Sequence, residues 1–136
     1  MPLYMLDTNT ASAALRGAAA LDRRLQQLET SQWCISAVTH AEMRYGVALK
    51  PEASRLAQCV DAFLQAVVTM PWDAAAADRH GQLRARLRKA GTPIGDFDEM
   101  IAGHALALGA VLVTDNIRHF AVVDGLVVEN WIRSSS

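Results

Sequence analysis

Short apolar runs alternate along the chain with longer stretches in which apolar residues recur at helical spacing. The first run, Leu3–Leu6, leads directly into the polar residues Asp7, Thr8 and Asn9. A continuous apolar run ended by polar residues predicts a short strand that is buried on both faces. Four further runs predict strands at Trp33–Ser36, Val67–Met70, Ala110–Thr114 and Leu126–Val128.

Apolar residues three and four positions apart predict helices between these strands. Gly17, Gly91 and Gly109 each follow such a stretch and are expected to end a helix. Either Thr8 or Asn9 is expected to cap the first helix, and capping of the same helix is also the ordinary explanation for Asp7. The predicted helices cover Thr10–Arg16, Ala18–Glu29, Ala37–Leu49, Glu52–Ala66, Ala74–Lys89 and Asp96–Leu108. Strands that alternate with helices predict an α/β fold with a central parallel sheet flanked by helices.

The chain of 136 residues is 51% apolar, which is enough for one domain with a real core. We expect that domain to span residues 1–133, followed by a frayed tail at Ser134–Ser136. No apolar run approaches the roughly 18 residues that cross a membrane, and the N-terminus shows no signal peptide, so a cytoplasmic location is expected. Cys34 and Cys59 are expected to be reduced, buried thiols.

The net charge of −1 gives no global attraction to nucleic acid or to a membrane surface. Any binding of nucleic acid must therefore depend on a local basic patch or on bound metal ions. No Cys or His spacing resembles a zinc site.

Four acids fall just behind predicted strands or near the start of predicted helices: Asp7, Glu42, Asp98 and Asp115. In a parallel sheet these positions lie at one edge, outside the carboxyl ends of the strands. Each acid also has an ordinary explanation, because the helix dipole favours acids near helix N-termini. If the four converge, their oxygen ligands favour a hard cation, Mg²⁺ or Mn²⁺. The spacing alone leaves both explanations open.

The acids occur within segments that have a characteristic set of neighbours. These segments are Leu6–Asn9, Ser36–Glu42, Pro93–Ala102 and Val113–Asn116, with Phe120 just beyond. In this order and spacing they resemble the motifs of PIN-domain ribonucleases, and more specifically those of the VapC toxins of bacterial toxin–antitoxin modules. The resemblance extends from Met5 to Trp131, and the block Pro93–Ala102 followed by Val113–Asn116 is its most specific part.

The resemblance implies a single PIN-like, Rossmann-like domain that hydrolyses phosphodiester bonds in structured RNA, either tRNA or rRNA. It places the catalytic metal ligands on Asp7, Glu42 and Asp98. The fourth acidic position falls on Asp115 or Asn116, and we favour Asp115 because the ion requires charge. The implied cofactor is Mg²⁺, with Mn²⁺ as a substitute.

Five residues are expected to support this site: Thr8, Asn9, Asp96, Thr114 and Asn116. The Thr114 hydroxyl matches a group that hydrogen-bonds a ligand carboxylate or a water. Asp96 lies beside the site, and its favoured role is to cap the following helix.

The resemblance also implies two kinds of protein partner. Relatives use the helices that correspond to residues 10–28, together with the helix from Glu52, for homodimer contacts and for a groove that accepts a VapB-type antitoxin. We therefore expect a homodimer and a cognate antitoxin, and no membrane association.

Basic residues cluster at the end of the alanine-rich helix: Arg84, Arg86, Arg88 and Lys89. Such a run usually forms a solvated face that complements the helix C-terminus, but part of it is a candidate for contacts with RNA phosphates. Arg44 lies two residues after Glu42. Its role is either a surface ion pair or a contact near the acids, and the sequence does not choose between them.

Other polar and aromatic residues have structural explanations. The four histidines form no ligand pattern, and His104 lies among apolar residues, which favours a packed side chain. Trp33, Trp72 and Trp131 lie beside predicted strands or turns and are more typical of packing than of base stacking.

Two other functions are alternatives to a metal-dependent nuclease. Phosphotransfer on a strand-end aspartate usually requires a second Asp two residues on, where this chain has Asn9, and a lysine near the site. Lys89 is the only lysine in the C-terminal half. A PIN fold that binds without catalysis would not need to retain all four acids.

Overall fold

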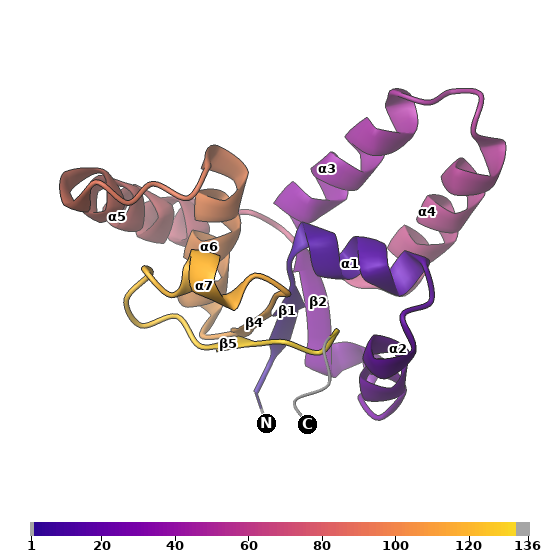
Figure 1. Ribbon diagram of the computed structural model, residues 1–136, viewed down its shortest axis with the longest axis horizontal. Coiled ribbons are helices and arrows are strands. Elements are labelled where there is room, and N and C mark those ends of the chain that lie inside the picture. Colours follow the sequence, from indigo (N-terminus) through magenta and orange to yellow (C-terminus); the bar gives the residue numbers. More distant parts are fainter. Residues whose placement is uncertain (1, 133–136) are drawn as a thin grey trace.

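Five short parallel strands form one sheet in the order β3-β2-β1-β4-β5 (Figure 1). In the computed structural model, which describes residues 2–132, they are β1 (Tyr4–Leu6), β2 (Trp33–Ser36), β3 (Val68–Met70), β4 (Val111–Val113) and β5 (Val128–Glu129). All neighbouring strands pair in parallel. The chain passes from β1 to β2 and β3 on one side and then returns to β4 and β5 on the other. The topological switch point, where ligands bind in such sheets, therefore lies between β1 and β4.

Helices cover both faces of this sheet. Among the described residues they are α1 (Thr8–Leu15), α2 (Ala19–Gln26), the 3₁₀ turn η1 (Thr30–Gln32), α3 (Ala37–Ala48), α4 (Ser54–Ala66), α5 (Ala74–Ala90), α6 (Asp96–Leu108) and α7 (Ile117–Phe120). Figure 1 shows α5, α6 and α7 on one side of the sheet and α1, α2 and α4 on the other.

Two hydrophobic clusters result, because successive strand side chains point to opposite faces. Met5 and Leu112 pack with buried residues of α5 and α6 in the first cluster. Leu6 and Val113 pack with buried residues of α1, α2 and α4 in the second. All four side chains are fully buried. This two-sided burial explains why the strands read as continuous apolar runs rather than as alternating patterns.

The predicted α/β fold with a central parallel sheet is confirmed, and the main differences concern element boundaries. Helix α1 begins at Thr8 rather than at Thr10, because Asp7 is its N-cap: the Asp7 carboxylate accepts the Thr10 N–H at 2.9 Å. The expectation that Thr8 or Asn9 caps this helix was wrong.

Several other boundaries move for local reasons. Helix α4 begins at Ser54 instead of Glu52, because Pro51 lies in a turn that precedes the helix. The helix predicted at Ala18–Glu29 is shorter, and η1 follows it. The last strand lies at Val128–Glu129, where it pairs with Leu112–Val113 of β4. The sequence pattern did not predict α7.

The two cysteines differ in burial. Both are free thiols, but Cys59 is exposed, which contradicts the expectation for that residue. Cys34 is buried in β2, and burial raises the pKa of its thiol to about 12. Within residues 2–132, no helix is both long and apolar enough to cross a bilayer. The predicted tail at Ser134–Ser136 lies outside the described residues.

Helices α5 and α6 approach each other closely at Gly103. A Cβ atom at this position would lie 2.7 Å from the Cα and 2.8 Å from the backbone N of His80. The clash would be with backbone atoms, so no rotation of a side chain would relieve it. Glycine is therefore required here by the distance between the two helices.

We predict that Gly103→Ala lowers the free energy of unfolding by about 1–3 kcal/mol, as overpacking of a core does. Gly81→Ala is a matched control, because Gly81 lies in α5 and a Cβ there would meet nothing within 4 Å. That control is expected to raise the free energy of unfolding by up to about 1 kcal/mol through helix propensity. Urea unfolding measures both, and equal losses would contradict the packing explanation.

Candidate active site

Asp7 follows the central strand directly and is held at the switch point. Its backbone N–H donates to the Val113 carbonyl at 3.0 Å, which ties the end of β1 to β4. Its side chain is only 4% exposed and caps α1 through the Thr10 N–H. The same carboxylate therefore starts the first helix and lies at the carboxyl edge of the sheet.

Glu42 reaches this edge from α3. Ser36, the last residue of β2, caps that helix by accepting the Val38 N–H at 3.1 Å. The Thr8 hydroxyl then donates to Glu42 Oε1 at 2.6 Å and lies 3.1 Å from the Thr39 hydroxyl. Thr8 thus joins the start of α1 to α3 and fixes the Glu42 carboxylate.

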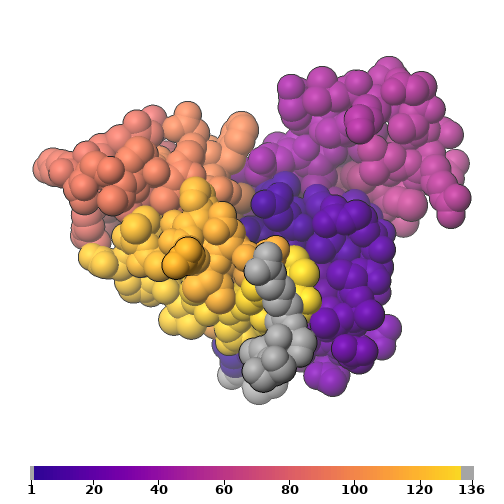
Figure 2. Space-filling view, viewed as in Figure 1, coloured from indigo at the N-terminus to yellow at the C-terminus, as the bar shows by residue number. Residues whose placement is uncertain are grey.

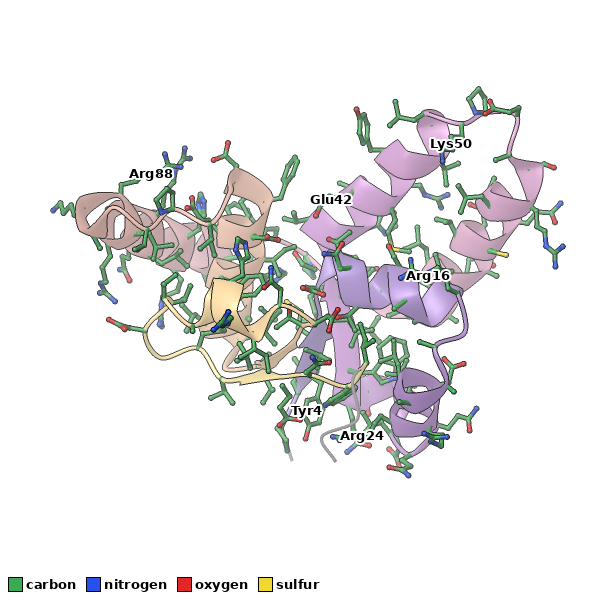
Figure 3. All side chains as sticks on the ribbon, in the orientation of Figure 1. Tyr4, Arg16, Arg24, Glu42, Lys50 and Arg88 are labelled. Atoms are coloured by element: carbon green, nitrogen blue, oxygen red, sulfur yellow. The ribbon has the colours of Figure 1, made fainter. Side chains whose placement is uncertain are left out.

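Asp98 reaches the edge from the first turn of α6. The His119 Nε2–H donates to Asp98 Oδ2 at 2.9 Å. His119 comes from α7, which is separated from α6 by β4 in the chain. The hydrogen bond therefore links two helices that are not consecutive elements. Figure 2 shows the surface notched between the N-terminal end of α6 and α3, and Figure 3 places Glu42 on the α3 side.

The three acids act on one another electrostatically. Burial raises the pKa of Glu42, the charges of Asp98 and Asp7 raise it further, and the Thr8 hydrogen bond partly offsets the increase. Burial also raises the pKa of Asp98, with a contribution from Asp7, against the lowering effect of His119. Repulsion between neighbouring carboxylates disfavours their charged forms. Asp7, Glu42 and Asp98 therefore lie close enough for their charges to interact.

Asp115 follows β4 but occupies a different environment. Its carboxylate accepts a hydrogen bond from Asn130 Nδ2 at 3.1 Å. Asp7, Glu42 and Asp98 are thus the three predicted acids whose charges interact, and Asp115 is bonded to Asn130 at the end of β4.

Comparison with known proteins identifies the fold and the enzyme class. The family model of the PIN domain matches residues 4–126. This chain belongs to the PIN-domain family.

Two VapC proteins align with nearly the whole chain. The tRNA(fMet)-specific endonuclease VapC of Salmonella typhimurium is 38% identical over 128 residues, which cover 94% of this chain and 97% of that protein. Ribonuclease VapC2 of Rickettsia felis is 34% identical over 131 residues, which cover 95% and 98%.

Solved structures agree with the sequence comparison. The DNA-bound VapBC structure from Salmonella typhimurium superposes with a TM-score of 0.90 at 37% identity, covering 96% of this chain and 99% of that chain. The VapBC2 structure from Rickettsia felis, bound to a promoter fragment, gives 0.88 at 32% identity, with 95% and 98% coverage. The resemblance seen in the sequence is confirmed: this PIN domain is a ribonuclease of the VapC type.

PIN-domain ribonucleases use a divalent metal, and the acids of this PIN domain suit one chemically. Their oxygen donors are those that hard cations prefer, and a cation would relieve the repulsion that raises the pKa values of Glu42 and Asp98. As positioned, no three Asp, Glu, His or Cys side chains within residues 2–132 are grouped closely enough to hold an ion. Each carboxylate is instead bonded to a protein donor: the Thr10 N–H, the Thr8 hydroxyl or His119.

The expected role of Asp96 was wrong. Gly95 is the N-cap of α6, with φ of +103°, a conformation that favours glycine. The turn is made one residue earlier than predicted, so Asp96 is already helical. Its side chain is 71% exposed and lies 3.4 Å from Arg88 and 3.6 Å from Arg84.

Glu99 is fully buried, and the sequence did not predict a role for it beside the site. It accepts the Ile94 N–H at 3.2 Å and lies 3.8 Å from Arg84 and 3.5 Å from Arg88. These contacts fasten the loop before α6 to its first turn, beside Asp98. The available signal was its position three residues before Ala102, on the buried side of the helix.

The remaining supporting residues have defined positions. The Thr114 hydroxyl accepts the Asn116 N–H at 3.0 Å, so it closes the turn after β4 rather than binding one of the acids. Asn9 and Asn116 are exposed. Arg44 forms a surface ion pair with Asp61, which resolves the alternative left open for it.

The interpretations of His104 and Trp131 as packed side chains agree with the structure, whereas the contact of His119 with Asp98 was not predicted. His104 is 1% exposed and forms a 2.8 Å hydrogen bond with the Ser36 hydroxyl. Trp131 is 3% exposed; it packs against Tyr4, with ring centroids 4.8 Å apart, and lies under the Arg24 guanidinium at 4.4 Å. Trp131 is therefore occupied by packing contacts.

The raised pKa of Glu42 predicts a pH-dependent loss of stability in EDTA. A carboxyl whose pKa is higher in the folded than in the unfolded chain binds protons preferentially in the folded state. The free energy of unfolding therefore falls as pH rises from the ordinary glutamate range through the raised pKa. Glu42→Gln keeps an acceptor for the Thr8 hydroxyl and removes the charge, so its Tm at neutral pH should exceed that of the parent chain, with a smaller decline.

Thermal unfolding monitored by circular dichroism across pH measures this effect. Asp124→Asn serves as the control, because it removes one carboxylate from an exposed position. A lower Tm for Glu42→Gln, or an equal gain in the control, would show that the charge of Glu42 does not destabilise the fold.

Proposed function

We propose that this VapC-type ribonuclease is a Mg²⁺-dependent endonuclease that hydrolyses phosphodiester bonds in tRNA. The observation that carries the proposal is the shared electrostatic site of Asp7, Glu42 and Asp98 at the carboxyl edge of the sheet. A bound divalent ion lowers the pKa of water and neutralises charge that develops on the phosphate.

Side chains of this chain would hold the divalent ion and supply the negative charge that binds it. Asp7 is the central ligand in this proposal, with Glu42 and Asp98 on either side, and Asp115 or Asn116 supplies the fourth position. Thr8 would hold the Glu42 carboxylate and His119 the Asp98 carboxylate in a fixed orientation. Such orienting partners tune metal ligands in many sites.

Two relatives support tRNA over rRNA as the substrate. The VapC proteins of Salmonella typhimurium and Shigella flexneri, 38% and 39% identical to this chain, are both named tRNA(fMet)-specific endonucleases. The sequence motifs alone do not separate tRNA from rRNA, and the names of these two relatives favour initiator tRNA. The proposed location is the cytoplasm, where that substrate is found.

A VapB-type antitoxin is the proposed protein partner, because several solved relatives are VapBC assemblies. A cleft of about 370 Å³ lies between α1, α3 and α4 and is lined largely by apolar residues. Thr8 and Glu42 also line this cleft. Tyr45 of α3 and Leu49, the C-cap of that helix, are 65% and 61% exposed. An antitoxin segment with an apolar face would cover this cleft and approach the acids. The homodimer stays a prediction.

We predict that the purified chain cleaves an initiator tRNA transcript at discrete positions in Mg²⁺ or Mn²⁺ and not in EDTA. Asp98→Asn should reduce the cleavage rate by at least about 100-fold, because it removes a proposed metal ligand while it retains an acceptor for His119. Gel analysis of end-labelled RNA measures the rate.

Asp124→Asn is the matched control and should cleave like the parent chain. Cleavage that persists in EDTA, or in Asp98→Asn, would contradict a metal site built on these acids. Equal cleavage of rRNA fragments and initiator tRNA would contradict the substrate assignment.

A further inference from the structure

Helix α1 presents three polar side chains along one face, and they border a cleft that the proposed chemistry does not use. Asn9, Ser12 and Arg16 are three and four residues apart, which places them on one side of a helix. They line a cleft of about 470 Å³ together with Asp115 and other residues. All three side chains are hydrogen-bond donors.

Two of these residues also line the cleft on the other side of α1. Ser12 and Arg16 border the 370 Å³ cleft that includes Thr8 and Glu42. Figure 3 shows Glu42 on α3 near the start of α1, and Arg16 toward the other end of α1. Ser12 and Arg16 therefore lie where the two clefts adjoin, and each cleft reaches one of the predicted acids.

Arg16 is exposed, and within residues 2–132 its guanidinium forms no ion pair. Three other arginines are engaged: Arg44 with Asp61, and both Arg84 and Arg88 with acids of α6. An unpaired guanidinium with a neighbouring hydroxyl is well suited to a phosphate, which it can bind with two hydrogen bonds.

An RNA strand that approaches Asp7, Glu42 and Asp98 meets three carboxylates, and the chain has a net charge of −1. Cations along the path of the strand must offset this repulsion. At 1.5 Å per residue, Arg16 lies about 13 Å from Asp7 along the helix axis. This distance places its charge at a phosphate beyond the one that is cut.

We propose that Ser12 and Arg16 form a phosphate-binding site for the RNA strand, which crosses α1 between the two clefts. The proposal rests on the proposed ribonuclease function and adds a substrate-positioning site outside the acids. Because the contact is with the backbone, it does not require a particular base sequence.

The test is the salt dependence of binding to a short fluorescein-labelled oligouridine, measured by anisotropy in an Asp98→Asn background to prevent cleavage. Loss of one single-strand phosphate contact reduces the slope of log K against log salt by about 0.7. Arg16→Gln should show this reduction and bind several-fold more weakly at low salt, and Arg16→Lys should retain most of the slope. Arg23→Gln is the control, because Arg23 is exposed on α2 and does not line either cleft.

An unchanged slope in Arg16→Gln, or an equal change in Arg23→Gln, would overturn the proposal. Absence of binding by the Asp98→Asn parent would also overturn it, since a backbone contact needs no specific sequence. An Arg16→Gln chain that loses affinity for a purified VapB antitoxin but keeps its RNA slope would assign the cleft to the protein partner instead. Failure of the proposed ribonuclease function is seen separately, as absence of metal-dependent cleavage by the unmodified chain.

Discussion

Repulsion among three neighbouring carboxylates, of which Asp7 is buried and Glu42 and Asp98 are partly buried, is the constraint on which the edge of the sheet depends. Asp7, Glu42 and Asp98 come from β1, α3 and α6, and the parallel sheet brings all three elements to one edge. The charges of neighbouring acids add to burial in raising the pKa values of Glu42 and Asp98. The fold tolerates this cost because each carboxylate accepts a hydrogen bond from a different element or from its own helix. The same repulsion provides affinity for a cation.

Much of the fold follows from features that are local in the sequence. The strand at Tyr4–Leu6 was predicted because both of its faces are buried, which leaves a continuous apolar run. Once strands and helices alternate, parallel pairing follows, and the positions after β1 and β4 must lie at one edge. The placement of Asp7 and Asp98 near this edge could therefore be predicted without coordinates. The same pattern placed Glu42 in the first half of the helix after the second strand, and the motif resemblance added the expectation that these acids bind a metal ion.

The features that could not be predicted from the sequence become apparent only in the folded chain. His119 bonds Asp98 from a four-residue helix that is too short to produce a periodic pattern. Gly95 replaces Asp96 as the N-cap because of its positive φ, which spacing does not reveal. Glu99 is buried against arginines of α5, so its partners become apparent only when α5 and α6 are packed together. Two of these three features depend on tertiary hydrogen bonds or ion pairs, and the third depends on a backbone conformation; hydrophobic periodicity reveals none of them.

The central claim is that the three acids form a site for a divalent cation, and direct binding of Mn²⁺ tests it without reference to any RNA. Titration at neutral pH, followed by the loss of the free-ion electron paramagnetic resonance signal, should show saturable binding to the parent chain. Asp7→Asn should abolish this binding, because Asp7 contributes to the raised pKa of both other acids. Saturable binding of equal affinity in Asp7→Asn, or none in the parent chain, would contradict the account.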